Sequence, residues 1–217
     1  MSTSRKKIMI LSVIFSALMI SFSYSLVEVC EAQVSFTFTS SDTEGIAIIG
    51  DTIEFHSTLT NTGSTGDTYD IEKIEKPPTP LDWVVELCTG TFCFDESVNY
   101  VAVYLDPSDS EHVGLRINTL SDGPGKITIR VTSQANPSLI DSITFILSRP
   151  DCGDMNGSGS INLSDVIQLA KFYFGVGDPP GSNWASDVNC DASINLTDVI
   201  LIANFYFGKL TTLNCCP

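Results

Sequence analysis

The sequence predicts an all-β sandwich followed by a small all-α module that holds two copies of one loop and helix unit. Between residues 34 and 147, apolar and polar residues alternate in short runs, which is typical of strands with one buried face. Two acidic, asparagine-rich loops begin at Asp154 and Asp187, and each runs into an apolar segment of helical length. A chain of 217 residues has room for one or two domains with a real core.

The N-terminus has the organisation of an export signal. Basic residues at 5–7 precede a segment, 8–27, that contains no charged residue, and small residues follow up to Ala32. We therefore expect residues 1–32 to be a signal peptide cleaved after Ala32, and the mature protein to be extracellular or on the cell surface. An uncleaved anchor is the alternative, because an uncharged run of this length can span a bilayer. A lipid anchor on Cys30 is disfavoured, since the residues just before it are not small.

The composition bounds the class of partner. Asp and Glu number 26 against 11 Lys and Arg, for a net charge of −15. Nucleic acid and anionic membrane surfaces are therefore poor partners, and cations are better ones. Charged residues make up only 17% of the chain and hydrophobic ones 43%, so the acidity belongs to a folded protein and not to a disordered acidic tail.

Strand patterns extend over residues 33–149. Alternation is clearest at 34–39, 52–60, 101–105 and 126–131, and turns rich in Gly, Pro, Asn and Asp separate these runs. About seven strands at this spacing predict a two-sheet sandwich. The run through Asn61, Asp67, Trp83, Cys88 and Leu105, continuing from Thr132 to Ser142, is similar to immunoglobulin-like extracellular modules, which implies a spacer or binding module. We expect Trp83 to be a core residue, with a sugar-stacking platform as the alternative.

We expect no catalysis. The chain has two histidines, His56 and His112, and both lie in strand-like alternation, where an exposed or hydrogen-bonded strand residue is the simplest role. Sequence motifs for zinc proteases, serine hydrolases and phosphate-binding loops are missing from the 217 residues. Nothing in the sequence identifies a pair of glycosidase carboxylates.

The two acidic loops have the ligand spacing of a twelve-residue EF-hand calcium loop. Counted from Asp154 and from Asp187, oxygen-bearing side chains occupy positions 1, 3, 5, 9 and 12, and position 7 can contribute its carbonyl. Corresponding residues, such as Asp165 and Asp198, are 33 positions apart, so the loop and its helix are duplicated. An acidic turn without metal is the alternative.

The segment before Asp154 has no helical pattern, unlike the entering helix of an ordinary EF-hand. Two units of loop plus exiting helix, with Asn at position 9 and Asp at position 12, resemble the dockerin type I repeat family over about 152–208, within a module at 151–217. The resemblance implies two calcium ions. The implied ligands in loop one are Asp154, Asn156, Ser158, Ser160 through its carbonyl, Asn162 and Asp165. In loop two they are Asp187, Asn189, Asp191, Ser193 through its carbonyl, Asn195 and Asp198.

Each loop departs once from the family pattern. Loop one has Ser158 where an acid is usual, which leaves it two carboxylates against three in loop two. Loop two has Ala192 where the turn favours glycine, and a left-handed backbone costs a residue with a Cβ about 1–2 kcal/mol. Because these departures oppose each other, the sequence does not rank the loops by affinity.

The two helices are expected to pack together and to leave apolar surface over. The predicted packing face comprises Val166, Leu169, Ala170 and Tyr173 with their copies Val199, Ile202, Ala203 and Tyr206. The surplus comprises Ile167, Phe172 and Phe174 with their copies Ile200, Phe205 and Phe207. The resemblance implies a cohesin-like partner, selected in part at loop positions 10 and 11, which are Leu163, Ser164, Leu196 and Thr197. Near-identical repeats imply that a partner could bind either one in a reversed pose.

The cysteines support export. Removing Cys30 with the signal leaves six, an even number suited to disulfides. We expect Cys88 and Cys93 to pair across a glycine turn, and two further bridges to clip the C-terminus to the loops. The pairing among Cys152, Cys190, Cys215 and Cys216 stays open. Zinc is disfavoured because the chain has no C-x2-C spacing.

The expected function is assembly of an exported, non-catalytic calcium-binding protein through its C-terminal module. Metal binding should be coupled to folding of the module, because the acidic oxygens repel one another without it. One alternative is an intramolecular calcium and disulfide staple in a structural or adhesive surface protein, with the helix face covered by the sandwich. Another is an accessory component of a polysaccharide-degrading system, which would need a cleft with two carboxylates near Trp83; carbohydrate binding has no further support in the sequence.

Overall fold

The computed structural model describes residues 33–215. The expected signal peptide, with Cys30 and the Ala32 cleavage site, lies outside the described residues, as does Cys216. Residues from Val34 onward belong to one compact unit. In the part described, no helix has both the length and the apolar character needed to cross a membrane.

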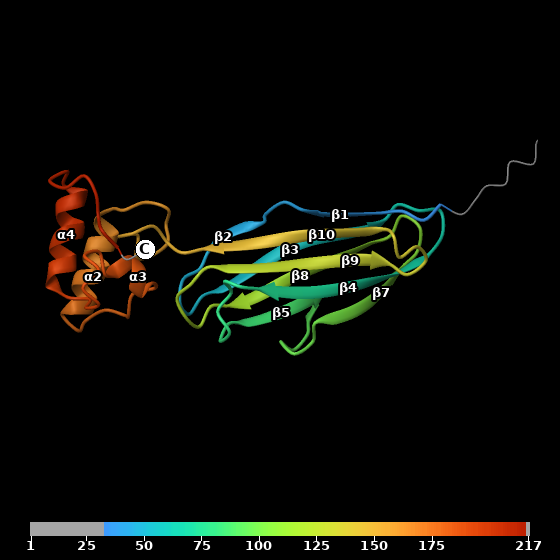
Figure 1. The fold of residues 1–217 in the computed structure, drawn as a ribbon, viewed down its shortest axis with the longest axis horizontal. Helices are drawn as coiled ribbons and strands as arrows, with labels where there is room; N and C mark the ends of the chain where they lie inside the picture. Colours follow the sequence, from blue (N-terminus) through green and yellow to red (C-terminus); the bar gives the residue numbers. More distant parts are fainter. Residues whose placement is uncertain (1–32, 216–217) are drawn as a thin grey trace, which may run out of the picture. The chain divides into compact units, whose positions relative to one another are not determined.

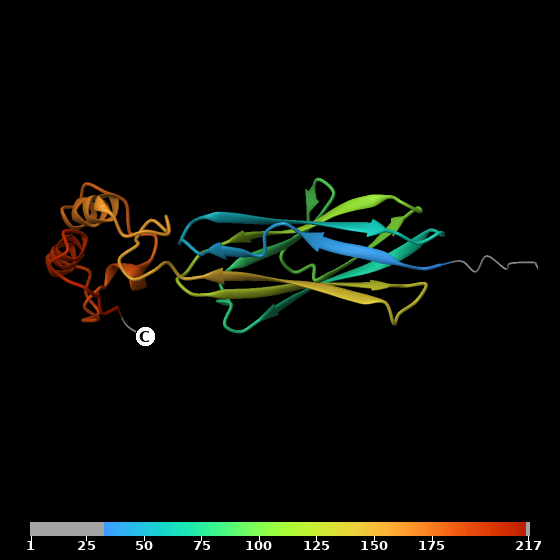
Figure 2. The same cartoon turned by 90° about the horizontal axis from the view of Figure 1, so that it is seen from above.

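Two five-stranded sheets form a β-sandwich (Figure 1). The first sheet has the order β1 (Phe36–Ser40), β3 (Thr52–Asn61), β8 (Ser110–Asn118), β5 (Val84–Thr89) and β6 (Phe92–Cys93). The second has the order β2 (Glu44–Ile46), β10 (Ile140–Ser148), β9 (Gly125–Ser133), β4 (Asp67–Lys76) and β7 (Tyr100–Leu105). Neighbouring strands are antiparallel, except that β2 runs parallel to β10. The two sheets are seen as separate layers in Figure 2.

The core of the sandwich is formed by side chains at alternate positions of the strands. Inward residues such as Leu59, Ile71, Leu115, Ile129 and Phe145 are buried and belong to one apolar cluster, while their strand neighbours face outward. Trp83 is also buried, at 4% exposed, and its indole N–H donates to the Ser121 carbonyl at 2.9 Å. The expectation of a core tryptophan is confirmed, and its ring is not available as a sugar platform.

The expectation of about seven strands was too low. Each predicted run coincides with a strand, namely β1, β3, β7 or β9. Strands β2 and β6 have three and two residues, too few to show alternation. The inner face of β4 is interrupted by Lys73, whose buried ammonium group donates to the Val85 and Glu96 carbonyls and pairs with Glu75 at 3.2 Å. A lysine at an inward position interrupts the alternation of apolar and polar residues from which a strand is predicted.

The C-terminal module contains helices α2 (Leu163–Tyr173), α3 (Asn183–Ser186) and α4 (Leu196–Tyr206). Helices α2 and α4 lie against each other (Figure 1). Each begins at a capping box built from Asn162 and Asp165, or from Asn195 and Asp198, which satisfies otherwise unpaired N–H groups of the first turn.

The module has its own small core. Met155, Leu169, Val188 and Ile202 are buried together with Val199 in a cluster separate from that of the sandwich. Two of these side chains, Met155 and Val188, come from the second position of the two loops. The loops are therefore structural parts of the core and not appendages to the helices.

Candidate metal centre

The two acidic loops adopt the same backbone conformation. Positions 4 and 6 are left-handed in both, with φ of +66° at Gly157 and +80° at Gly159, and +60° at Cys190 and +65° at Ala192. Loop one meets this requirement with glycine, and loop two does not. A residue with a Cβ pays about 1–2 kcal/mol for this conformation, so the rest of loop two must hold Ala192 in place.

The carboxylate of the first aspartate in each loop accepts hydrogen bonds from the backbone N–H groups of positions 5 and 6. The Asp154 carboxylate accepts hydrogen bonds from the amides of Ser158 at 3.0 Å and Gly159 at 2.8 Å. The Asp187 carboxylate accepts from Asp191 at 3.1 Å and Ala192 at 2.8 Å. These bonds wrap the backbone of positions 5 and 6 around the first carboxylate.

The last aspartate closes each loop. The Asp165 carboxylate accepts from the amides of Met155 at 3.0 Å and Asn162 at 2.9 Å. The Asp198 carboxylate accepts from Val188 at 3.0 Å and Asn195 at 2.9 Å. Position 12 is therefore bonded to position 2, which places the first turn of the helix beside the start of the loop.

The expected ligands at positions 3 and 9 also make the same hydrogen bonds in both loops. At position 3, the side-chain oxygen of Asn156 or Asn189 accepts from the amide at position 5. At position 9, the side-chain N–H of Asn162 or Asn195 donates to the carbonyl at position 7, which belongs to Ser160 or Ser193. Position 5 differs, because the Ser158 hydroxyl donates to the Ser160 carbonyl, whereas the Asp191 carboxylate accepts from the Ser193 amide.

Three of the five loop carboxylates are buried without a basic neighbour, while Asp187 is partly buried and Asp191 is exposed. Asp154, Asp165 and Asp198 are each 0% exposed, and the ion pairs among the described residues all lie in the sandwich. Burial raises the pKa of the Asp198 carboxyl, and the charges of Asp187 and Asp191 raise it further against two backbone donors that lower it. A buried carboxylate is stable only if a cation or hydrogen bonds compensate its charge.

The donor set fits a hard cation. Carboxylate, amide, hydroxyl and carbonyl oxygens are the ligands that calcium takes, in sets of six to eight. Among residues 33–215, no three His, Cys, Asp or Glu side chains form a group that could by itself hold a metal. A calcium ion would therefore depend on the Asn, Ser and backbone oxygens that alternate with the acids in each loop.

The two helices expose side chains at the same positions of the repeat. Leu163 and Leu196 are 44% and 41% exposed, and Phe174 and Phe207 are 68% and 65% exposed. Ile167 and Ile200 are exposed too, as are Ser164 and Thr197 at position 11. Each exposed apolar residue of α2 thus has its copy exposed on α4.

The expected division of the aromatic residues was wrong at two of the three aromatic positions in each repeat. Tyr173 and Tyr206, placed on the packing face, are 43% and 42% exposed, whereas Phe172 and Phe205, placed in the surplus, are partly buried. Phe172 packs against the module core. The tyrosines end their helices and pack edge to face on the next phenylalanine, with ring centroids 5.1 and 5.0 Å apart.

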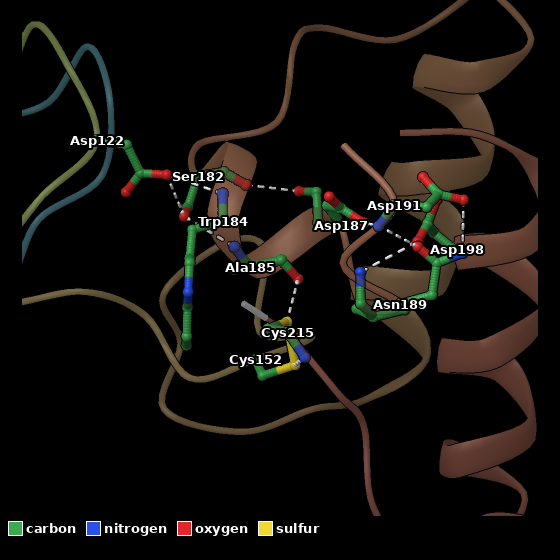
Figure 3. The surroundings of a disulfide bond; sticks show 12 residues. Asp122, Cys152, Ser182, Trp184, Ala185, Asp187, Asn189, Asp191, Asp198 and Cys215 are labelled. Carbon is green, nitrogen blue, oxygen red and sulfur yellow. Dashed lines mark hydrogen bonds between the residues drawn. A yellow bond between two sulfur atoms is a disulfide. The ribbon is translucent and has the colours of Figure 1, made fainter. Parts of the chain in front are cut away.

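Disulfides fix both parts of the chain. Cys88 and Cys93 pair across the β5–β6 hairpin, as expected. Cys152 pairs with Cys215 over a separation of 63 residues, which ties the start of loop one to the C-terminus (Figure 3). Cys190, at position 4 of loop two, is also disulfide-bonded.

A short helix before loop two contacts the sandwich, and no pattern in the sequence predicted it. Asp122, in the turn between β8 and β9, accepts from the Ser182 hydroxyl at 3.0 Å and the Trp184 amide at 2.8 Å (Figure 3). Helix α3 ends at Ser186, directly before Asp187. A sandwich carboxylate is thereby linked to the start of loop two. A single turn of helix is too short for a periodic pattern, and an Asp-Gly-Pro turn is common in loops.

A second contact involves loop one and Ile48, which follows β2. A methyl group built on Gly157 would lie 2.5 Å from Ile48 Cδ1, and one on Gly181 would lie 2.4 Å from Ile48 Cγ2. The Ile49 amide also donates to the Gly181 carbonyl at 2.7 Å. Ile48 therefore fills a place that two glycines leave open.

The site and fold define a β-sandwich protein with a duplicated, oxygen-rich loop and helix unit. No family model matches the chain, and no curated protein matches it. Among solved structures, a conjugative transposon lipoprotein from Bacteroides eggerthii is 16% identical, with 52% of this chain and 96% of that chain covered and a TM-score of 0.38. A lipoprotein from Bacteroides thetaiotaomicron is 11% identical, with 62% and 94% covered and a TM-score of 0.38. The N-terminal domain of PorA is 14% identical, with 58% and 100% covered and a TM-score of 0.39.

Proposed function

We propose that this chain is an exported calcium-binding protein whose C-terminal module, similar to dockerin type I repeats, joins it to a cohesin-like domain. The observation that carries the proposal is the matched pair of loops. From Asp154 to Asp165 and from Asp187 to Asp198, the same positions make the same backbone bonds, although the loops differ at positions 2, 4, 5, 6 and 11.

Each loop would hold one calcium ion through its six expected ligands. The ion supplies the positive charge that the buried Asp154, Asp165 and Asp198 lack. Because position 12 lies in the first turn of the helix, a bound ion stabilises loop and helix together, and calcium binding is linked to folding of the module. Loop two offers the additional carboxylate of Asp191, and loop one has the less strained backbone.

The repeated exposed surface supports an assembly role. Leu163, Ile167 and Phe174 on one helix and Leu196, Ile200 and Phe207 on the other form two equivalent apolar patches, and exposed apolar surface of this kind marks interaction sites. A partner that recognises one patch can recognise the other after rotation. The sandwich, with its immunoglobulin-like pattern, would act as a spacer or a second binding module.

The contacts of Ile48 and Asp122 favour a second function, an intramolecular staple. In that case calcium and the disulfides fix the module to the sandwich in a structural or adhesive surface protein. The two roles are compatible, because these contacts involve α3 and the loops and leave Phe174 and Phe207 exposed. The burial of Trp83 removes a sugar-stacking platform, whereas the polysaccharide alternative calls for a cleft with two carboxylates near Trp83 and stays untested.

The assembly role is tested with Phe174→Ser, Phe207→Ser and the double variant, each assayed for binding to a set of purified cohesin domains in calcium by calorimetry. We expect either single variant to bind, because one patch remains, and the double variant to lose binding. Ile146→Ser, on an exposed sandwich position, is the matched control. If no cohesin domain binds the unmodified chain, or the double variant binds equally well, assembly through this face is refuted and the staple remains.

A further inference from the structure

We propose that His56 and His112 form a binding site for a divalent transition-metal ion, separate from the calcium loops. They are the only histidines of the chain and lie 56 residues apart in sequence. Strands β3 and β8 bring them together, with His56 Nδ1 2.8 Å from His112 Nε2. The ring centroids are 5.0 Å apart and the planes are inclined by 50°.

The separation of the two nitrogens suits one ion. Metal to imidazole nitrogen bonds measure about 2.0–2.1 Å, which places two adjacent ligands of one ion about 3 Å apart. The observed 2.8 Å is that of a hydrogen bond, in which the lone pair of one nitrogen points at the other, so both rings must turn to direct their lone pairs at one ion while the distance between the nitrogens changes little. Both rings lie on the outer face of the sheet, and His56 is well exposed, so an ion can enter without unfolding the strands.

A glycine makes room for the pair. Gly114 lies opposite His56 on one side and Cys88 on the other, and a methyl group there would lie 3.0 Å from His112 Cε1. The missing side chain lets the His112 ring lie over the strand. The result is a hollow of about 250 Å³, lined by both histidines, Glu54, Arg116 and the Cys88–Cys93 disulfide, which leaves space for the water ligands that two imidazoles do not supply.

The protonation states are compatible with coordination. The His56 Nε2 atom lies 4.0 Å from the Glu54 carboxylate, and a carboxylate on this side favours the tautomer with the proton on Nε2 and a bare Nδ1. With His56 Nδ1 bare, the hydrogen bond between the rings has its proton on His112 Nε2, and His112 Nδ1 is buried without a hydrogen-bond partner, so that bond alone sets the tautomer of His112. Binding requires only that the proton shared between the rings moves to the other nitrogen of His112.

The surrounding charges favour a cation. Glu54 and Glu86 both approach Arg116, at 3.9 and 3.1 Å, and the Glu111 carboxylate accepts from the His112 amide at 2.9 Å. Two carboxylates thus face one guanidinium, and a third lies beside the His112 backbone. Imidazole is a ligand for borderline ions, and affinity rises along the first-row series to copper(II), so copper(II) should bind most tightly, followed by nickel(II) or zinc(II).

The test uses the exported chain, residues 33–217, without a purification tag and with calcium present. Copper(II) is titrated and followed by electron paramagnetic resonance, and zinc(II) is followed by the proton NMR signals of the two imidazole rings. We expect one copper(II) with nitrogen hyperfine coupling, and zinc(II) shifts of both rings together. His56→Gln or His112→Gln should weaken binding by at least about 100-fold, and Glu54→Gln by about tenfold, as for an outer partner of a ligand.

Two controls separate this site from others. Asp154→Asn with Asp187→Asn should leave copper(II) binding unchanged, because the calcium loops lie elsewhere. The double variant His56→Gln with His112→Gln reports binding at the chain terminus. The proposal is overturned if that double variant binds copper(II) as the unmodified chain does, if only one ring responds to zinc(II), or if neither ion binds.

Discussion

A methyl group at Gly181 tests whether the module contacts the sandwich as described. The added Cβ would lie 2.4 Å from Ile48 Cγ2 and 3.2 Å from the Met155 carbonyl oxygen, well inside the 3.5–4.0 Å of an ordinary carbon contact. Gly181 is not in the left-handed region, so its substitution creates a clash without backbone strain. Overpacking of this kind lowers the free energy of unfolding by about 1–3 kcal/mol.

Truncating the neighbour should relieve the clash. Ile48→Ala alone should cost about 2 kcal/mol, the low end for isoleucine, because the side chain is only partly buried. In the double variant with Gly181→Ala, the new methyl group occupies space that Ile48 vacated. We expect the combined loss to be smaller than the sum of the single losses by about 1–2 kcal/mol.

The assay is urea unfolding of the four proteins in calcium, arranged as a double-mutant cycle. Gly159→Ala is the matched control, because its Cβ would meet nothing within 4 Å and its cost arises from φ of +80°. It should lower stability by about 1–2 kcal/mol and show no coupling to Ile48→Ala. Additivity of Gly181→Ala and Ile48→Ala within about 0.5 kcal/mol would refute the contact.

Further substitutions probe other parts of the fold. Asp122→Ala removes the acceptor of two hydrogen bonds to α3 and should destabilise the chain by about 1–2 kcal/mol in thermal melts, as for a lost N-cap; Asp122→Asn should lose less, and equal losses would contradict this role. Lys73→Ala leaves the Val85 and Glu96 carbonyls unpaired and opens a cavity, so it should cost about 3–5 kcal/mol in urea unfolding. Lys73→Met leaves the same carbonyls unpaired but fills the volume, so it should cost less, and the reverse order would be evidence against a well-packed site. Replacing Cys152 and Cys215 by serine removes the disulfide that spans 63 residues. The free energy of unfolding should fall by about 4 kcal/mol, because the unfolded chain gains entropy, and an unchanged melting temperature would contradict this.

Patterns within one element were readable from the sequence. Alternation at 52–60 located β3, and the spacing from Asp154 to Asp165 located a loop that closes on a helix. The left-handed turn at Ala192 was also expected, and φ there is +65°. These features depend on local backbone geometry, which a run of a dozen residues determines.

Features that depend on distant residues were not readable. The pairing of Cys152 with Cys215 was one of several possibilities, and the approach of His56 to His112 depends on the register of two strands. The roles of Tyr173 and Phe172 were exchanged, because apolar spacing on a short helix does not say which side a neighbouring helix covers. The contact made by Ile48 could not be predicted, because nothing distinguishes an isoleucine that follows a strand until the glycines packed against it are known.

Calcium titration by calorimetry on the exported chain, with Asp154→Ala and Asp187→Ala variants and thermal melts in chelator, tests the central claim most directly. We predict two sites, each lost with its own aspartate, a gain of helix on binding and a lower melting temperature in chelator. Absence of calcium binding, with melting unchanged by chelator, would mean that hydrogen bonds and disulfides alone hold the loops, and would contradict the account.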